Sequence, residues 1–235
     1  MIEFVSVTGS TNADLIARLR GGELVAEGYW LVADRQDAGR GRSGRIWQDG
    51  SGNFMGSTVV HVGPHDPPPP TLSFVAALAL YDAVAECLAN PAGLMLKWPN
   101  DLLLSGAKLA GILLEGEGRS IVVGMGVNLA QAPDLPDRRT IALSALGPAP
   151  DRDIFAAGLS ARFGAQLETW RVLGKDRLFE RWLAMAHPIG AMLTVKEPDG
   201  HEAAGAFDGL DPDGALRLRL ADGTARVIHA GDVIA

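Results

Sequence analysis

A glycine-punctuated loop with three arginines is the segment of this chain whose residue types most clearly suggest chemistry. The range Gly39–Trp47 reads GRGRSGRIW. Glycine lets a backbone adopt positive φ and approach a ligand closely, and arginine presents a planar, permanently charged fork that suits carboxylates and phosphates. Because the whole chain has a formal charge of −7, this local concentration of positive charge predicts an anion site. Taken alone, the loop is also compatible with a mobile basic surface segment or one that touches RNA.

The loop formally matches two known glycine motifs but lacks their surroundings. Gly39, Gly41 and Gly44 have the spacing of the dinucleotide fingerprint, which requires a helix to open at the last glycine. Residues 48–53 read QDGSGN, which is typical of turns. A kinase glycine loop would need His-Arg-Asp and Asp-Phe-Gly motifs, and neither occurs. The loop is therefore a different kind of phosphate cradle, or none.

Two further segments place polar residues beside apolar strands. In Lys97–Asp101, proline ends a strand and presents Asn100 and Asp101 where sites in sheet proteins gather. In Lys108–Glu115, a lysine opens an almost wholly apolar strand and could point into a cleft. An ordinary turn and a snorkelling edge lysine are the respective alternatives.

A third segment, Gly124–Leu129, contains two glycines spaced by two residues. In a strand this spacing puts Gly124 and Gly126 on the same face, where the missing side chains leave room for a flat group. A bulge or tight strand packing would explain the same pattern.

The elements around these segments predict an α/β domain followed by a small β module. Ser10-Thr11-Asn12 is expected to cap a first helix, with Asp14 completing a weak capping box. Strands are expected at 2–7, 29–33, 53–62, 94–98, 109–115 and 121–129, and later helices at 71–89, 152–171 and 175–186. Three Asp-Gly turns, at 199–200, 213–214 and 222–223, indicate a β-barrel of roughly 48 residues. The domains are thus expected at 1–186 and 187–235.

Composition indicates an ordinary globular protein in the reducing cytoplasm. The chain has 235 residues, of which 47% are hydrophobic and 21% charged. The single cysteine, Cys87, cannot form an internal disulfide and is expected to pack in the core. No apolar run reaches the roughly 18 residues of a membrane span, and no signal-peptide pattern opens the chain. The acidic balance argues against nucleic acid as the main partner.

Together and in order, these segments resemble the biotin protein ligase family, the biotin–[acetyl-CoA-carboxylase] ligases. The resemblance runs through Ser10-Thr11-Asn12, Gln36, Gly39–Trp47, Lys97–Asp101, Lys108–Glu115 and Gly124–Asn128. It implies a class II synthetase-like mixed sheet flanked by helices, with a C-terminal SH3-like β-barrel. Because the winged-helix domain of repressor-type members has no counterpart in the sequence, the chain looks like a ligase only.

The resemblance implies a two-step reaction. Biotin and MgATP give biotinyl-5′-adenylate and pyrophosphate, and the acyl group then passes to one lysine of a biotin carboxyl carrier protein. The implied cofactors are ATP and Mg²⁺, and Asp101 is a candidate for holding the metal through water. A homodimer formed through the sheet is a further implication.

The resemblance also implies a role for each matched residue. Lys108 would bridge the biotin carboxylate and the α-phosphate, Arg40 and Arg42 would close over the ligands, and Asp101 is a candidate base. The biotin-binding set is Ser10, Thr11, Asn12, Gln36, Gly39, Arg40, Gly41, Arg42, Lys108, Gly111, Leu113, Gly124 and Gly126. The ATP-binding set is Arg42, Arg45, Trp47, Asn100, Asp101, Lys108 and Asn128.

Three rival functions can be weighed from the sequence. A lipoate or octanoate ligase or transferase would share the fold, but the arginine loop and the Lys-Trp-Pro-Asn-Asp motif favour biotin. A biotin-sensing regulator without turnover is the second alternative. The chain is not the carrier itself, because carriers present a Met-Lys-Met hairpin and no Met-Lys pair occurs here.

Overall fold

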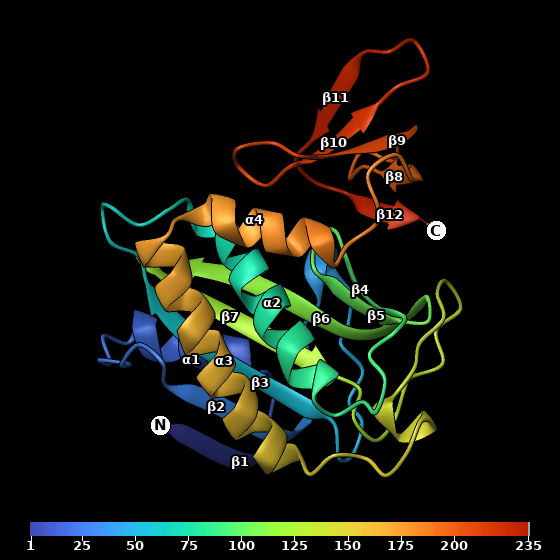
Figure 1. Ribbon diagram of the computed structural model, residues 1–235. Coiled ribbons are helices and arrows are strands. Elements are labelled where there is room, and N and C mark those ends of the chain that lie inside the picture. The colour runs from blue at the N-terminus through green and yellow to red at the C-terminus, as the bar shows by residue number, and fades with distance from the viewer. Residues whose placement is uncertain (235) are drawn as a thin grey trace.

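A seven-stranded mixed sheet forms the centre of the structure, a computed structural model that describes residues 1–234 (Figure 1). The order is β1-β2-β3-β7-β6-β5-β4, in which β1 and β2 run parallel and all other neighbours are antiparallel. The strands are β1 (Ile2–Thr8), β2 (Trp30–Gln36), β3 (Phe54–His61), β4 (Leu94–Lys97), β5 (Asp101–Leu104), β6 (Ala107–Glu117) and β7 (Ser120–Val127). The predicted mixed sheet is confirmed, with β5 as a strand that the sequence analysis had not counted separately.

Helices cover both faces of this sheet. They are α1 (Thr11–Arg20), α2 (Leu72–Ala85), α3 (Arg152–Val172) and α4 (Lys175–Ala184). On one face, Val59 and Val122 pack with Leu15 of α1. Their neighbours Val60 and Val123 point the opposite way, into the core shared with α2 and α3. Because side chains alternate along a strand, each strand supplies both layers of the core.

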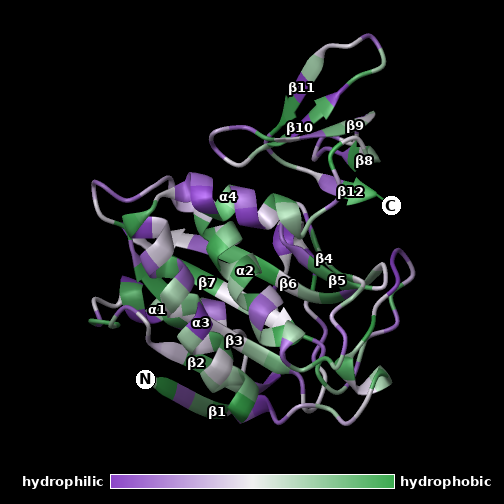
Figure 2. Ribbon diagram, in the orientation of Figure 1, coloured by the Kyte–Doolittle hydropathy of each residue, from purple (hydrophilic) through white to green (hydrophobic). Residues whose placement is uncertain are grey.

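Helix α2 is apolar along most of its length, as Figure 2 shows, because it lies between the sheet and the helices α3 and α4. It ends at Ala85, earlier than the predicted residue 89. Thr71 precedes it, but its hydroxyl donates to the Pro68 carbonyl at 2.6 Å and makes no cap. Cys87 therefore lies beyond the helix and is exposed, so its predicted place in the core is wrong.

The C-terminal module is a five-stranded antiparallel sheet in the order β11-β10-β9-β8-β12. Its strands are β8 (Met192–Lys196), β9 (Glu202–Leu210), β10 (Leu216–Arg219), β11 (Ala225–Ile228) and β12 (Asp232–Ile234). Gly200, Gly214 and Gly223 all have positive φ in the predicted turns. Ala235, the last residue of the predicted second domain, lies outside the described residues.

The module is docked on the helical domain rather than tethered to it. The Trp98 indole nitrogen, which is buried, donates to the Gly214 carbonyl at 3.1 Å. Val195 and Phe207 belong to the same hydrophobic core as α2 and α4. Figure 1 shows the module above α4, with β12 nearest to β4 and β5. This contact fixes β12 beside the strand ends that carry Asn100 and Asp101.

The proline-rich segment Pro64–Pro70 is tied to the helical layer by its own contacts. Asp66 accepts from the Gly63 amide at 2.9 Å and pairs with Arg171 of α3 at 3.4 Å. Pro69 and Pro70 begin a 3-10 turn that leads directly into α2. The segment is a packed connection to the helical layer.

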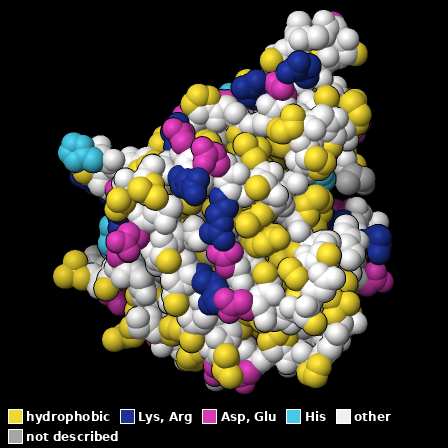
Figure 3. Space-filling view, in the orientation of Figure 1, with side chains coloured by type: hydrophobic (Ala, Val, Ile, Leu, Met, Phe, Trp, Pro, Cys, Tyr) yellow, Lys and Arg dark blue, Asp and Glu magenta, His cyan; other side chains and the backbone are white. Residues whose placement is uncertain are grey.

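Charged side chains of both signs are interspersed over the helical face in Figure 3. The pairing of Arg181 with Asp82 at 2.6 Å is one of the ion pairs on these helices. Within residues 1–234, no helix combines the length and apolar character that crossing a membrane requires.

Candidate active site

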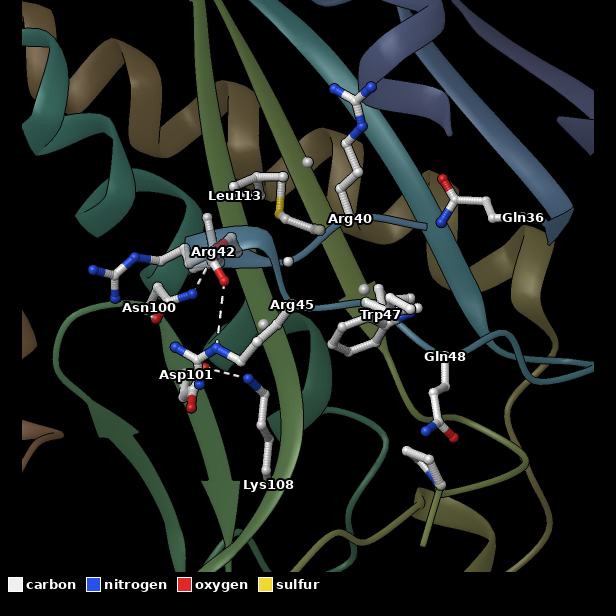
Figure 4. A pocket seen from close by; sticks show the side chains of 18 of the residues that line it. Gln36, Arg40, Arg42, Arg45, Trp47, Gln48, Asn100, Asp101, Lys108 and Leu113 are labelled. Carbon is white, nitrogen blue, oxygen red and sulfur yellow. Dashed lines mark hydrogen bonds and ion pairs between the residues drawn. The ribbon is translucent and has the colours of Figure 1, made fainter. Parts of the chain in front are cut away.

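A pocket of about 500 Å³ opens between the sheet, the start of α1 and the arginine loop. Its walls include Ser57 of β3 and Leu113 of β6, which face the same side of the sheet as α1. Every site residue expected from the sequence except Gly39 lines this pocket, and Figure 4 shows ten of its side chains with labels. The fold thus brings segments that are more than a hundred residues apart into one site.

Strand β7 and the residues that follow it form the floor of the pocket. A compartment of neutral polar groups lies at one end of this floor, and a charged compartment lies further along it. Gly124 lies opposite Ser57 and Leu113, whereas Gly126 lies opposite Gly111. Asn128 follows, two residues further on. Because alternate strand residues are about 7 Å apart, these three positions mark successive compartments of the pocket.

The compartment at Gly124 is lined by neutral, hydrogen-bonded groups. The Ser57 hydroxyl donates to Asn12 Oδ1 at 2.6 Å, so the single Thr11 hydroxyl proton has two acceptors, Ser57 Oγ at 2.7 Å and Gln36 Oε1 at 3.1 Å. Gln36 Oε1 accepts from the Thr11 amide at 2.8 Å. These side chains are buried, and Ser10 caps α1 beside them by accepting from the Ala13 amide at 3.5 Å. Such a network suits a mostly apolar ligand with a polar edge.

The capping box predicted at the start of α1 does not form. Thr11 is committed to the pocket network, and Asp14 accepts a hydrogen bond from Thr8 instead. Ser10 alone supplies the cap, because its extended backbone precedes the first helical turn. The three polar residues at this terminus therefore divide between helix capping and the pocket.

Glu115 connects this compartment to the arginine loop. It accepts from Asn12 Nδ2 at 2.8 Å and from Arg40 Nη1 at 3.4 Å. Arg40 is therefore held on the neutral side of the pocket, with 55% of its side chain exposed. Glu115 is not among the site residues expected from the sequence.

Lys108 and Asp101 form an ion pair in the next compartment. Lys108 Nζ lies 2.6 Å from Asp101 Oδ1, and both side chains are largely buried. Asp101 begins β5 opposite Gly111, so neighbouring strands fix both partners (Figure 4). The pair presents a positioned ammonium group to the pocket.

The arginine loop is a short hairpin that folds over the floor. The Gly41 amide donates to the Arg45 carbonyl at 2.8 Å, and the Trp47 amide to the Gly39 carbonyl at 3.0 Å. Of its glycines, only Gly44 uses positive φ. At Gly39, a Cβ would lie 2.6 Å from the Trp47 carbonyl oxygen, so this glycine closes the neck of the hairpin and stays outside the pocket lining.

The predicted empty space above the glycines of β7 is filled by the protein's own side chains. A Cβ on Gly124 would lie 2.2 Å from Asn12 Oδ1, and one on Gly126 would lie 2.4 Å from the Trp47 indole. The indole also approaches Gly111, where the nearest ring carbon would be 3.2 Å from a Cβ. The flat group that this spacing accommodates is therefore Trp47, which in turn lines the pocket.

Arg42 and Arg45 stand close together at the mouth. Arg42 Nη1 donates to Asn100 Oδ1 at 3.1 Å. Burial lowers the pKa of the Arg42 guanidinium, the carboxylates of Asp232 and Asp101 oppose this shift, and Arg45 adds to it. Arginine nevertheless stays charged, so the mouth presents permanent cations.

Two buried polar atoms in the pocket have no hydrogen-bond partner among the described residues: Asn128 Oδ1 and Trp47 Nε1. The amide of Asn128 is oriented by its other end, since Nδ2 donates to the Ile141 carbonyl at 3.2 Å. Leaving such atoms unpaired costs about 1–3 kcal/mol each. One acceptor and one donor are thus available to a ligand.

Several lining residues had no clear signal in the sequence. Arg138 lies in the long segment between β7 and α3, where the adjacent main chain pairs with β6: the Lys108 amide donates to the Arg139 carbonyl at 2.9 Å. Asp232 reaches the pocket from the C-terminal module. Ser57 lies inside β3, a strand whose residues are mostly apolar. A basic pair after Asp137 was the only available hint for Arg138.

The protein offers little to a metal ion by itself. Within residues 1–234, no group of three or more His, Cys, Asp or Glu side chains is placed to hold one. Asp101 lines the pocket, but its Oδ1 already accepts from Lys108. Mg²⁺ usually needs only one or two protein carboxylates when substrate phosphates supply other ligands, so the donor set fits an ion that arrives with a nucleotide.

Comparison with known proteins agrees with this architecture. Residues 5–130 match the biotin/lipoate A/B protein ligase family, and residues 189–234 match the biotin protein ligase C-terminal domain. The biotin protein ligase of Aquifex aeolicus in complex with biotin and ATP superposes with a TM-score of 0.85 at 24% identity, covering 99% of this chain and 97% of that one.

Two sequence relatives have nearly the same length. The biotin–[acetyl-CoA-carboxylase] ligase of Mycobacterium tuberculosis is 38% identical over 240 residues, covering 99% of this chain and 88% of the relative. The ligase of the same name from Paracoccus denitrificans is 39% identical, covering 96% and 97%. The chain belongs to the biotin/lipoate A/B protein ligase family and, within it, to the biotin protein ligases.

Proposed function

We propose that this protein activates biotin with ATP and transfers it to one lysine of a biotin carboxyl carrier protein. The main support is the division of the pocket into two compartments. Neutral hydrogen-bonding groups lie at Gly124. The largely buried Lys108 ammonium and the unpaired atoms Trp47 Nε1 and Asn128 Oδ1 lie on the side of Gly126 and Asn128, where a nucleotide would bind. The relatives named biotin–[acetyl-CoA-carboxylase] ligase support the same activity.

In the first step, a biotin carboxylate oxygen attacks the α-phosphorus of ATP and pyrophosphate leaves. The two reacting groups are anions, so the fixed cation Lys108 offsets their repulsion and stabilises charge on the five-coordinate phosphorus. Asp101 holds the ammonium in place through the 2.6 Å ion pair. Arg40 and Arg42 bind from the loop and exclude water from the mixed anhydride.

The ligands divide between the two compartments. Ser10, Thr11, Asn12 and Gln36 hold the polar ureido edge of biotin, with Gly111 and Leu113 on the floor and Gly41 in the loop above. Asn128 Oδ1 accepts from the adenine amino group, and Trp47, Arg45 and Asn100 complete the nucleotide side. Mg²⁺, when bound with ATP, supplies further positive charge to the phosphates.

In the second step, the amine of the carrier lysine attacks the biotinyl carbonyl carbon, and AMP leaves. The attacking amine loses a proton, and we assign Asp101 as the base that receives it. We assign residues 1–186 to the domain that holds both ligands and residues 187–235 to the C-terminal β domain. The exposed, unpaired Cys87 suits the cytoplasm.

The test is biotinylation of a purified carrier domain. The protein, biotin, MgATP and carrier are incubated, and intact-mass spectrometry measures addition of one biotinyl group. A carrier whose acceptor lysine is replaced by arginine serves as control. The proposal expects ATP-dependent labelling of that lysine alone, and folded protein that leaves the carrier unmodified contradicts it.

A further inference from the structure

The C-terminal module supplies one charged side chain to the mouth of the pocket. Asp232, at the start of β12, lies 187 residues from Arg45 in sequence, yet Asp232 Oδ2 and Arg45 Nη2 are 2.5 Å apart. The other carboxylate oxygen lies 3.8 Å from Arg42 Nη1. A single carboxylate therefore stands between two arginines of the glycine-rich loop.

Asp232 begins a paired β-strand, whereas the two arginines that it contacts lie in the loop between β2 and β3. β12 pairs with β8 from Asp232 to Ile234, and the module is docked through Trp98 and the shared core. Asn100, the other partner of Arg42, lies in the turn before β5 and is tied to β6: its side-chain amide donates to the Ile112 carbonyl at 2.7 Å, and its main-chain carbonyl accepts from the Ile112 amide at 3.0 Å. Two acceptors held outside the loop thus contact its arginines.

Asp232 offsets the electrostatic repulsion between Arg42 and Arg45. Arg42 and Arg45 are two like charges at a partly desolvated mouth, with only 26% and 36% of their side chains exposed. Without an anion between them their repulsion favours an open loop. A carboxylate between two guanidinium groups takes the place that a ligand anion takes later.

We propose that Asp232 is a positioning residue that gathers Arg42 and Arg45 over the pocket before substrate binds, which makes the C-terminal module the anchor of the arginine loop. The expected effect on the KM for ATP rests on the proposed function. A loop that is already closed binds ATP at little conformational cost, since apparent affinity falls with the fraction of molecules in the competent state. Once ATP is bound, its phosphates hold the arginines, so turnover at saturation does not depend on Asp232.

The test compares Asp232→Asn with a matched control, Asp208→Asn. Asp208 also bridges two arginines, Arg217 at 2.6 Å and Arg219 at 2.7 Å, but within the module and away from the loop. Asp232→Glu keeps the charge. In biotin-dependent ATP–pyrophosphate exchange, Asp232→Asn is expected to raise the KM for ATP roughly threefold to fivefold with little change in kcat. The Asp208→Asn protein should behave like the unaltered protein, and Asp232→Glu, which keeps the charge, should raise the KM for ATP less than Asp232→Asn does.

A second readout does not require any activity. Trypsin cuts after arginine, so cleavage after Arg40, Arg42 and Arg45 reports how often the ligand-free loop opens. Asp232→Asn should be cut faster in this loop, and Asp208→Asn should not. A lower or unchanged KM, or unchanged loop cleavage, overturns the proposal. If the unaltered protein shows no exchange, the proposed function fails, while the cleavage result still decides the role of Asp232.

Discussion

The strand-borne floor of the pocket and the loop-borne roof reach the same ligand space but are held in different ways. On the floor, Lys108 and Asp101 sit in adjacent β-strands, and their ion pair is largely buried. On the roof, Arg40 and Arg45 belong to a hairpin of nine residues and pair with Glu115 and Asp232 at partly exposed positions. The floor is organised before ligand binds, whereas the roof depends on ion pairs that a ligand can replace.

This difference assigns separate contributions to the two regions. Preorganised charges act on the transition state because they need no rearrangement during the reaction. A loop that covers the ligands contributes by retaining the intermediate and excluding water. Floor substitutions should therefore change the chemical step, and roof substitutions should change binding and release.

The largest effect is expected at Lys108. Lys108→Ala should lower the rate of adenylate formation roughly 10²- to 10³-fold, the usual loss for one preorganised donor. Pyrophosphate exchange under saturating substrates measures it, and a thermal melt checks that the variant folds. Lys108→Arg keeps the charge and should lose less. A near-normal rate in Lys108→Ala would show that Lys108 does not stabilise the transition state of adenylate formation.

Arg42→Gly should act on release instead. It removes a charged donor at the mouth, which is worth about 1.5–3 kcal/mol, or roughly 10- to 100-fold in the dissociation rate of biotinyl-adenylate. Rapid dilution of the preformed intermediate measures this rate. Arg119→Gly, in the exposed turn between β6 and β7, is the control. If the intermediate leaves both variants equally slowly, the roof does not retain it.

A glycine substitution tests how tightly the floor is built. In Gly124→Ala, the new methyl group would displace Asn12, which is held by Ser57 at 2.6 Å and Glu115 at 2.8 Å. Overpacking of this kind costs about 1–3 kcal/mol, so we expect the KM for biotin to rise about tenfold. Gly116→Ala, whose Cβ would contact only Ile121 at 3.6 Å, should leave it unchanged. Equal KM values would mean that Asn12 does not meet biotin.

A change in salt concentration should give the smallest effect, and it should act on the ion pairs of the roof more than on the buried pair of the floor. The exposed ion pairs of the roof are screened as the Debye length falls from about 10 Å at 0.1 M to 3 Å at 1 M salt. Tryptic cleavage of the ligand-free loop, normalised to a small peptide substrate, should rise about twofold to threefold across this range. A loop whose protection ignores salt would be held by packing rather than charge.

Local signals predicted most of the site because the chemistry is concentrated in short segments. The turn after β4 presents Asn100 and Asp101 as proline required, and Lys108 points into the pocket. The two-residue spacing of Gly124 and Gly126 indicated that both share one face of a strand, but it could not show that Asn12 would cover the first glycine and Trp47 the second. That fact depends on how the hairpin folds back over the sheet.

Residues that reach the site through tertiary contacts were missed. Asp232 is an ordinary acidic residue before a short strand, and only the docking of the module through Trp98 brings it to Arg45. Cys87 was misplaced for a similar reason: its helical spacing looked buried, but α2 ends at Ala85. Sequence patterns specify faces and turns, while the packing of separate elements decides which residues meet.

ATP–pyrophosphate exchange with biotin, lipoate or octanoate supplied separately tests the central claim most directly. The proposed function assigns the neutral side of the pocket to the ureido edge of biotin, and it therefore predicts exchange with biotin alone. Exchange only with lipoate or octanoate would keep the fold and contradict the assigned substrate. No exchange with any of the three, in protein shown to be folded, would contradict the proposed adenylation.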